Sequence, residues 1–336
     1  MDPHRKAILI VGPILLIGAS FLLTQGATRD TSSALRAPNA FNVDVVEPLK
    51  NDTNSQLRRA CEATAQDLVP RLDRSDTILI RPPYVIAGDM TEEVLDRLYR
   101  DVVRPTERAL NISFFDASPS EPITIIAYAD EVRFRDFARQ VDRRKADSYY
   151  GYYLRPQRRV VVNVSTGSGT LAHELTHALA HFDFPQMPEW FDEGLASLFE
   201  QSEFTDNARR LCGTDNWRVH QVLRAIHENH LRPTFDLANT GLRTEHQAID
   251  YAQARYLCLY LQDQQLLEPY YRKLRSQSAV DPTGWNTLIS LLDFEKPVEI
   301  DADFRRWIVK FHKAQRQKTV SRGKQTLSMK PMPEMN

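Results

Sequence analysis

Residues 169–182 read G-T-L-A-H-E-L-T-H-A-L-A-H-F, and the expected chemistry of the chain follows from them. They contain the pattern H-E-x-x-H, in which His173 and His177 are four residues apart and Glu174 follows the first histidine. On an α-helix, residues four apart lie on one face, so both imidazoles can bind one metal ion. Glu174 would take a proton from a zinc-bound water, whose pKa the metal lowers toward neutrality.

The residues around this pattern predict the helix that the chemistry requires. An apolar stripe recurs at helical spacing on the face beside the histidines, formed by Leu171, Leu175, Ala178, Leu179 and Phe182. Gly167, Ser168 and Gly169 precede the stripe as helix breakers. The motif is therefore expected on one face of a helix whose other face packs against a core.

Glu193 is the expected third metal ligand. A catalytic zinc site needs three protein ligands and one open position. Glu193 comes sixteen residues after His177, in the run P-E-W-F-D-E-G-L-A, which is again typical of a helix. A second helix antiparallel to the first would present this carboxylate to the two histidines.

Two other residues are rival ligands. His181 lies one further helical turn after His177, although an additional histidine is more often a surface or hydrogen-bonded residue. Asp183 falls where the third ligand lies in an H-E-x-x-H-x-x-G-x-x-H/D site, but Ala180 replaces the glycine that turns the chain there. Both rank below Glu193.

The two motifs together resemble a known family. H-E-L-T-H followed by W-F-D-E-G-L-A resembles the gluzincin zinc metallopeptidases, in particular the peptidase MA-like group, over about residues 160–261. The resemblance implies that His173, His177 and Glu193 bind Zn²⁺ and that Glu174 is the general base and acid. It also implies an α+β, zincin-like fold, with a small mixed β-sheet over the active-site helix and a mostly α-helical lobe after it.

The chain departs from this family's pattern at two places. Ser197 occupies the position where the thermolysin-like pattern has an aspartate that orients a histidine, so another group must do this here. The chain also lacks the G-x-M-E-N stretch with which the aminopeptidase branch holds a free amino terminus. Endopeptidase activity is therefore preferred over aminopeptidase activity.

One further catalytic residue is proposed by the resemblance. Gluzincins often have a tyrosine at a place comparable to residues 250–261, and Tyr251 is the candidate whose hydroxyl would stabilise the oxyanion. The alternative is that Tyr251, Tyr256 and Tyr260 pack within a helical bundle.

A strand at residues 160–164 precedes the motif helix. In zincins resembling this chain, an edge strand at this place pairs with the extended substrate. An unbroken V-V-V run is equally typical of a strand covered on both faces, with no substrate contact. Both interpretations stay open on the sequence.

The chain divides into four expected segments. Residues 1–27 contain Arg5 and Lys6 before an uncharged apolar run, which is typical of a signal anchor or signal peptide, with an uncleaved membrane anchor preferred. Residues 28–54 are expected to be a polar tether, 55–314 the gluzincin-like peptidase domain and 315–336 a basic disordered tail. The catalytic domain would then lie on the extracytoplasmic side, tethered or secreted.

Apolar periodicity gives the expected elements of the domain. Strands are expected at 77–80, 84–87 and 123–129, with a hairpin at 149–154 and 159–164. Helices are expected at 57–68, from 91 until Pro105 ends or kinks it, at 131–141, and, after residue 200, at 217–229, 245–262, 266–276, 282–292 and 303–314.

Composition is consistent with one globular enzyme. The net charge of −1 gives no reason to expect a nucleic-acid partner. The three cysteines Cys61, Cys212 and Cys258 have no metal-site spacing. A Cys61–Cys212 disulfide in an exported domain and buried free thiols are both compatible with the sequence.

The sequence therefore predicts a zinc-dependent peptidase that acts on a peptide or protein, tethered to a membrane through its N-terminal segment. The alternative is a zincin-like binding or scaffold module without turnover. Glu174 disfavours this alternative, because a structural zinc site needs no base beside the metal.

Overall fold

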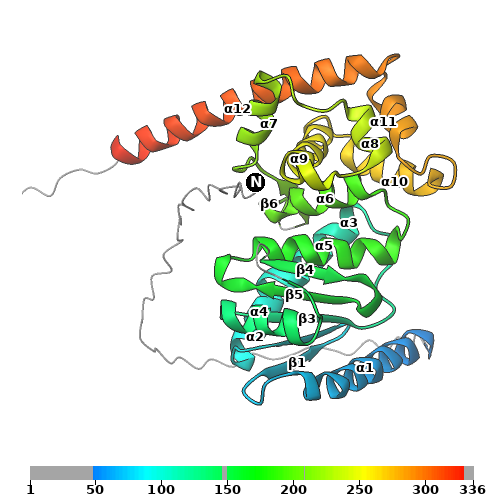
Figure 1. Ribbon diagram of the computed structural model, residues 1–336. Helices are drawn as coiled ribbons and strands as arrows, with labels where there is room; N and C mark the ends of the chain where they lie inside the picture. The colour runs from blue at the N-terminus through cyan, green and yellow to red at the C-terminus, as the bar shows by residue number, and fades with distance from the viewer. Residues whose placement is uncertain (1–47, 146–149, 208, 329–336) are drawn as a thin grey trace, which may run out of the picture. The chain divides into compact units, whose positions relative to one another are not determined.

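The computed structural model describes residues 48–145, 150–207 and 209–328. They form an α+β unit, with a five-stranded mixed sheet in the first half and mostly helices in the second (Figure 1). The first-half elements are α1 Pro48–Leu68, β1 Thr77–Arg81, β2 Tyr84–Gly88, α2 Glu92–Leu98, α3 Arg104–Ser113, β3 Ile123–Tyr128, α4 Glu131–Gln140, β4 Gly151–Leu154, β5 Arg159–Asn163 and α5 Gly169–Asp183. The expected N-terminal anchor lies outside the described residues, and so does the tether up to residue 47.

The strand order of the sheet is β1-β2-β3-β5-β4. β2, β3 and β5 are parallel neighbours, whereas β1 and β4 pair antiparallel at the two edges. The interpretation of residues 160–164 as an edge strand is therefore wrong. β5 is buried along its whole length between β3 and β4, as its run of valines permits, and β4 takes the edge.

Helices cover both faces of this sheet (Figure 1). α1 and α4 pack on one face, where alternate strand residues such as Val85 and Val161 meet Phe134 and Phe137. The intervening residues, such as Ile86 and Val160, face α2, α3 and α5 on the other side. The period-two alternation of the strands thus divides the core into two layers, and α5 carries the motif along the second layer.

The helix that contains Pro105 does not end there, although the sequence predicts an end or a kink at this residue. The chain passes from α2 through a π-helical stretch, Tyr99–Val103, directly into α3, where the proline lies in the first turn. The Arg104 N–H donates to the carbonyl oxygen of Tyr99, so the helix continues through the π-helical stretch and the proline removes only its own backbone donor.

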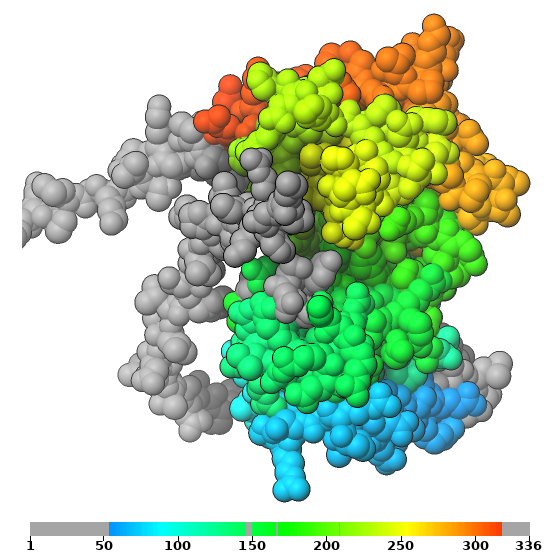
Figure 2. Space-filling view, in the orientation of Figure 1, coloured from blue at the N-terminus to red at the C-terminus, as the bar shows by residue number. Residues whose placement is uncertain are grey.

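The second half is built around α9, Gln247–Asp263, in which residues 252–261 are all buried. The other helices are α6 Glu189–Glu200, α7 Val219–His227, α8 Thr234–Thr240, α10 Leu267–Gln277, α11 Trp285–Leu292 and α12 Pro297–Ser328. α6 contacts both α5 and α9, so it joins the two halves. In the space-filling view, the yellow to orange helices adjoin the green residues below them (Figure 2).

Several boundaries differ from those expected. The hairpin of β6, Ser202–Thr205, and β7, Arg210–Gly213, and the short helix α8 lie in stretches where no helix or strand is expected. α1 begins at Pro48, inside the expected tether, and α12 continues to Ser328, inside the expected disordered tail. Polar, charged sequences at the ends of a domain resemble tethers, although they also suit exposed helices.

The three cysteines are free, with Cys61 and Cys258 buried, so the disulfide alternative is not realised. Within the part of the chain that the structure describes, no helix is both long and apolar enough to cross a bilayer.

Candidate metal centre

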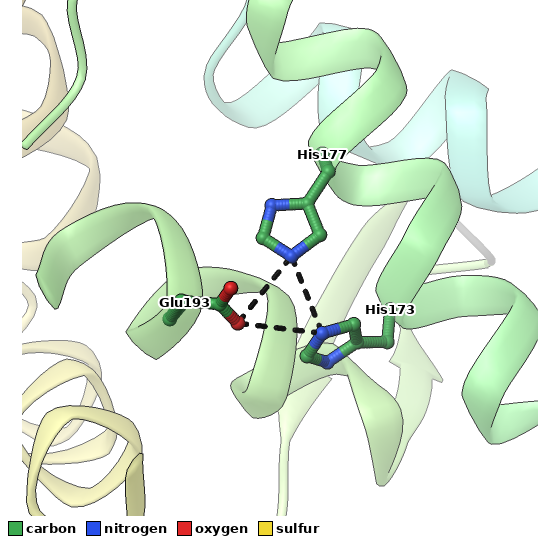
Figure 3. Close-up of side chains that lie close together, drawn as sticks. All are labelled: His173, His177 and Glu193. Atoms are coloured by element: carbon green, nitrogen blue, oxygen red, sulfur yellow. Dashed lines mark hydrogen bonds and ion pairs between the residues drawn. The ribbon is translucent and has the colours of Figure 1, made fainter. Parts of the chain in front are cut away.

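Two antiparallel helices bring the predicted ligands together. His173 and His177 point from successive turns of α5 toward Glu193, which α6 presents from the opposite side (Figure 3). The Nε2 atoms of the two histidines are 3.2 Å apart, and Glu193 Oε2 lies 3.6 Å from His173 Nε2 and 3.5 Å from His177 Nε2. Among the described residues, this is the one group of histidine, cysteine and acidic side chains with ligand atoms close enough to share a metal ion.

The donor set fits a zinc ion. Two imidazoles and one carboxylate are the ligands of a catalytic zinc site with an open fourth position. Glu193 Oε2 is buried without a hydrogen-bond partner, and such an oxygen needs a cation or a donor. Burial raises the pKa of the Glu193 carboxyl, but the neighbouring imidazoles of His173 and His177 outweigh burial and hold the pKa well below its usual range.

Asp192 orients the second histidine, a role the sequence analysis did not assign. Its Oδ1 lies 2.8 Å from His177 Nδ1, and its Oδ2 lies 3.1 Å from His181 Nε2. With Nε2 turned to the other ligands, His177 donates through Nδ1, which fixes its tautomer and ring orientation. Burial lowers the pKa of His177, but the carboxylates of Asp192 and Glu193 raise it by more. The pKa of His177 therefore lies well above the usual value.

Neither rival ligand belongs to the group. His181 lines the cleft, but its Nε2 contacts Asp192. Asp183 accepts hydrogen bonds from Tyr271 and Arg275 and from the backbone N–H groups of Asp116 and Ala117. Ser197 is fully buried on α6, and its hydroxyl oxygen has no hydrogen-bond partner.

Glu174 lies beside the three ligands and is only 7% exposed. Burial raises the pKa of its carboxyl, which the neighbouring histidines lower in part and Glu193 and Glu200 raise further. A carboxylate with a raised pKa is a stronger proton acceptor than one in water.

Tyr251, on α9, lines the same cleft as the three ligand candidates and Glu174. Burial, together with the negative charge of Glu193 beside it, raises the pKa of the Tyr251 hydroxyl, so the hydroxyl keeps its proton. Tyr256 and Tyr260 instead contact Asp215 and Asp303 within the helical half, as expected for tyrosines of a bundle.

A cleft of about 660 Å³ gives access to the group. Its lining includes His173, Glu174, His177, Glu193 and Tyr251, together with residues of the edge strand β4. Polar groups that converge in a concave site with perturbed pKa values are typical of a catalytic or binding centre.

Residues 167–284 match a family described as "Protein of unknown function (DUF1570)". The matched range contains α5, α6 and α9, and hence the three ligand candidates, Glu174 and Tyr251. A comparison with curated proteins found no match.

Proposed function

We propose that the chain is a zinc-dependent peptidase of the gluzincin kind, with a zincin-like fold and a preference for internal peptide bonds. The observation that carries this proposal is the convergence of His173, His177 and Glu193 in an open cleft with Glu174 beside them. A scaffold module has no use for a buried base beside a metal site.

Each residue of the site then has a role. His173, His177 and Glu193 would hold the zinc ion, which supplies Lewis-acid activation of a water molecule and of the scissile carbonyl. Glu174 accepts a proton from the attacking water and passes it to the leaving nitrogen. The Tyr251 hydroxyl, which stays protonated, donates a hydrogen bond to the oxygen that becomes negative as water adds.

The edge strand β4 suits an extended substrate better than β5 does. β5 is paired on both sides, whereas β4 pairs with β5 alone among the strands that the structure describes, and Gly151, Tyr152 and Tyr153 line the cleft. A peptide added to this edge gains backbone hydrogen bonds without a sequence requirement.

Zinc content and hydrolysis, measured on the same samples of the full-length chain, test the proposal. We expect one zinc per chain by mass spectrometry in the parent and in Glu174→Gln, and a large loss of zinc in Glu193→Ala. Glu174→Gln should lower kcat/KM on peptides by at least about a hundredfold, because the proton acceptor is gone. Glu203→Gln, at an exposed acid on β6, is the control and should leave both quantities unchanged.

The possible results separate the candidate functions. Zinc without hydrolysis of any peptide would favour the binding or scaffold module. Wild-type activity in Glu174→Gln would contradict the proposed mechanism, and full zinc in Glu193→Ala would contradict the ligand set.

A further inference from the structure

The edge strand β4 runs alongside the motif helix α5. At the start of the strand, a Cβ on Gly151 would come within 2.6 Å of Thr170 Cγ2, in the first turn of α5. Further along, the Tyr153 ring lies 5.4 Å from the ring of His181, near the end of α5. The two turns that carry the ligand histidines lie between these contacts. A peptide paired with β4 would therefore pass the candidate metal ligands.

The cleft follows the outer edge of β4. Successive residues of a strand point to opposite faces of the sheet, and Tyr152 and Tyr153 both line the cleft. Tyr152 packs in the layer of α1 and α4, whereas Tyr153 packs in the layer of α2, α3 and α5. Because β5 occupies the inner side of the strand, the space that both faces share is the side away from β5.

Three cationic side chains, Arg144, Lys145 and Arg155, line the same cleft and are named the β4 cations. The Arg144 guanidinium lies over the Tyr152 ring, 5.0 Å from its centroid. Arg155 directly follows the last residue of β4, and its Nη2 donates a hydrogen bond of 2.7 Å to the carbonyl oxygen of Pro185. One cation therefore lies beside the middle of the strand and another lies at its end.

The β4 cations are exposed, and no carboxylate lies within ion-pair distance of them among the described residues. The acidic side chains that line the cleft have other contacts. Asp192 is held by two imidazoles, and Glu200 pairs with Arg218. Glu193 faces the two histidines of the ligand group. Positive charge on the β4 side of the cleft is thus left for a ligand to match.

We propose that the β4 cations select peptide segments that carry aspartate or glutamate side chains beside the scissile bond. A peptide added to β4 holds its backbone against the strand and presents its side chains alternately to the two faces of the sheet. Its carboxylates then come near the β4 cations. The inference rests on the proposed peptidase function and deepens it by naming acidic peptides as the substrate class.

Other classes of ligand are disfavoured by the same arrangement. A lysine or arginine side chain in this part of the cleft would meet like charges, which lowers affinity. A neutral peptide keeps the backbone hydrogen bonds but gains no attraction to the cations. A nucleic acid is negatively charged, but it has no peptide N–H and C=O groups to pair with the edge of β4.

Peptides that differ only in charge test the inference. Three internally quenched peptides share one central sequence and carry Glu, Gln or Lys at the same positions on both sides of it. Their kcat/KM values are measured on the full-length zinc-loaded chain. We expect the Glu peptide to exceed the Gln peptide by about tenfold, equivalent to about 1.4 kcal/mol, which a few exposed ion pairs can supply. The Lys peptide should fall below the Gln peptide. Salt at about 1 M should remove most of the difference, because it shortens the Debye length to about 3 Å.

Variants of the β4 cations show whether they cause the preference. Arg155→Gln, and Arg144→Gln combined with Lys145→Gln, should each lower the ratio of kcat/KM for Glu over Gln by about threefold. Arg158→Gln is the matched control and should keep the ratio, because Arg158 belongs to the same hairpin but pairs with Glu121 and does not line the cleft. The ratio compares two peptides on one sample, so it does not depend on how much of a variant is folded.

The Kd of the same peptides for Glu174→Gln gives a second readout that needs no turnover, and the Glu peptide should bind most tightly. Equal kcat/KM for the three peptides, a preference for Lys, or a ratio unchanged in the variants would overturn the inference and leave the peptidase function standing.

Absence of hydrolysis would count against the function, and the Kd values would then decide the inference alone. Tighter binding of the Glu peptide that weakens when the β4 cations are replaced would support it, whereas no binding or equal Kd values would overturn it. A single-stranded oligonucleotide of the same charge that displaces the Glu peptide equally well would indicate a site for polyanions in general and would also overturn it.

Discussion

Orientation of His177 depends on a single carboxylate. Asp192 contacts His177 and His181 at once, so each of its oxygens is held by an imidazole. Groups that orient a metal ligand are typically worth ten- to a hundredfold in metal affinity, because the free ligand must otherwise be ordered on binding.

Asp192→Asn should therefore weaken zinc binding by about ten- to a hundredfold, since the amide is a poorer acceptor for His177 Nδ1–H. Competition with a chelator of known affinity measures the Kd. Glu203→Gln is again the control, and an unchanged zinc Kd in Asp192→Asn would show that α5 alone orients His177.

Tyr251 contributes to turnover and not to metal binding in the proposed mechanism. Tyr251→Phe removes the hydroxyl that would stabilise the developing negative charge and should lower kcat by about 10²- to 10³-fold. KM and zinc content should stay close to the parent values. Tyr260→Phe, which removes a hydroxyl bonded to Asp303 outside the cleft, is the matched control. Equal kcat in the two variants would assign Tyr251 to packing.

The individual site residues were predictable to different degrees. Spacing alone placed His173 and His177 on one helical face, because four residues make about one turn. Asp192 was missed because its role depends on how α6 packs against α5, although its place next to Glu193 is the signal that could have found it. The β4 cations belong to no motif, and only the tertiary structure brings them to the cleft.

At the scale of elements, the contact between α6 and α9 brings Glu193 and Tyr251 together. Gly194 makes this contact possible, because a Cβ there would lie 2.8 Å from the carbonyl oxygen of Ala254 and 2.9 Å from Cys258 Sγ. The glycine of the W-F-D-E-G-L-A run thus permits close approach of α9, one turn after Tyr251.

Gly194→Ala should separate α6 from α9. Helix propensity would favour alanine by about 1 kcal/mol. The clash with backbone should outweigh this gain and lower the free energy of unfolding by about 1–3 kcal/mol, and kcat should fall as Tyr251 moves away. Urea denaturation and steady-state kinetics measure the two effects.

Ser197→Ala is the matched control on the same helix. Its buried hydroxyl oxygen has no partner, so its removal should be neutral or slightly stabilising. Gly194→Ala with parent stability would mean that α9 adjusts without cost.

The elements themselves followed from the sequence better than their arrangement did. Runs of β-branched or aromatic residues predicted β1, β2, β3, β4 and β5, because the preference of such residues for strands is local. The strand order depends on pairing between distant segments. The parallel pairing of β3 with β5 places β4 at the edge, and residues 159–163 contain no signal that predicts this pairing. The β6–β7 hairpin was missed because exposed β6 lacks the apolar alternation of a half-buried strand.

At the scale of the whole molecule, one carboxylate joins three distant segments. Asp183, at the end of α5, accepts hydrogen bonds from the backbone of Asp116 and Ala117 after α3 and from Tyr271 and Arg275 of α10. Its side chain is 1% exposed. The motif helix is thereby attached to the sheet half and to the helical half at the same point.

Because these bonds require an ionised carboxylate, stability should depend on pH through Asp183. Burial raises the pKa of Asp183, but the hydrogen bonds from Ala117, Tyr271, Arg275 and Asp116 outweigh it and lower the pKa below its ordinary value of 3.8. A carboxyl with a lowered folded-state pKa stabilises the protein above its unfolded pKa, and this contribution is lost as the pH falls toward the folded pKa.

Asp183→Asn should lower the free energy of unfolding by about 3 kcal/mol at pH 7, the cost of breaking a buried ion pair. The difference from the parent should shrink as the pH falls below about 4, where the unfolded carboxyl of the parent takes up its proton. Urea denaturation of both proteins from pH 7 down to pH 3 measures it. Asp116→Asn removes the other carboxylate that pairs with Arg275. Because the Asp116 side chain is 72% exposed, its loss should cost less than about 1 kcal/mol at any pH. Equal losses in the two variants would mean that Arg275, and not the buried carboxylate, holds the three segments together.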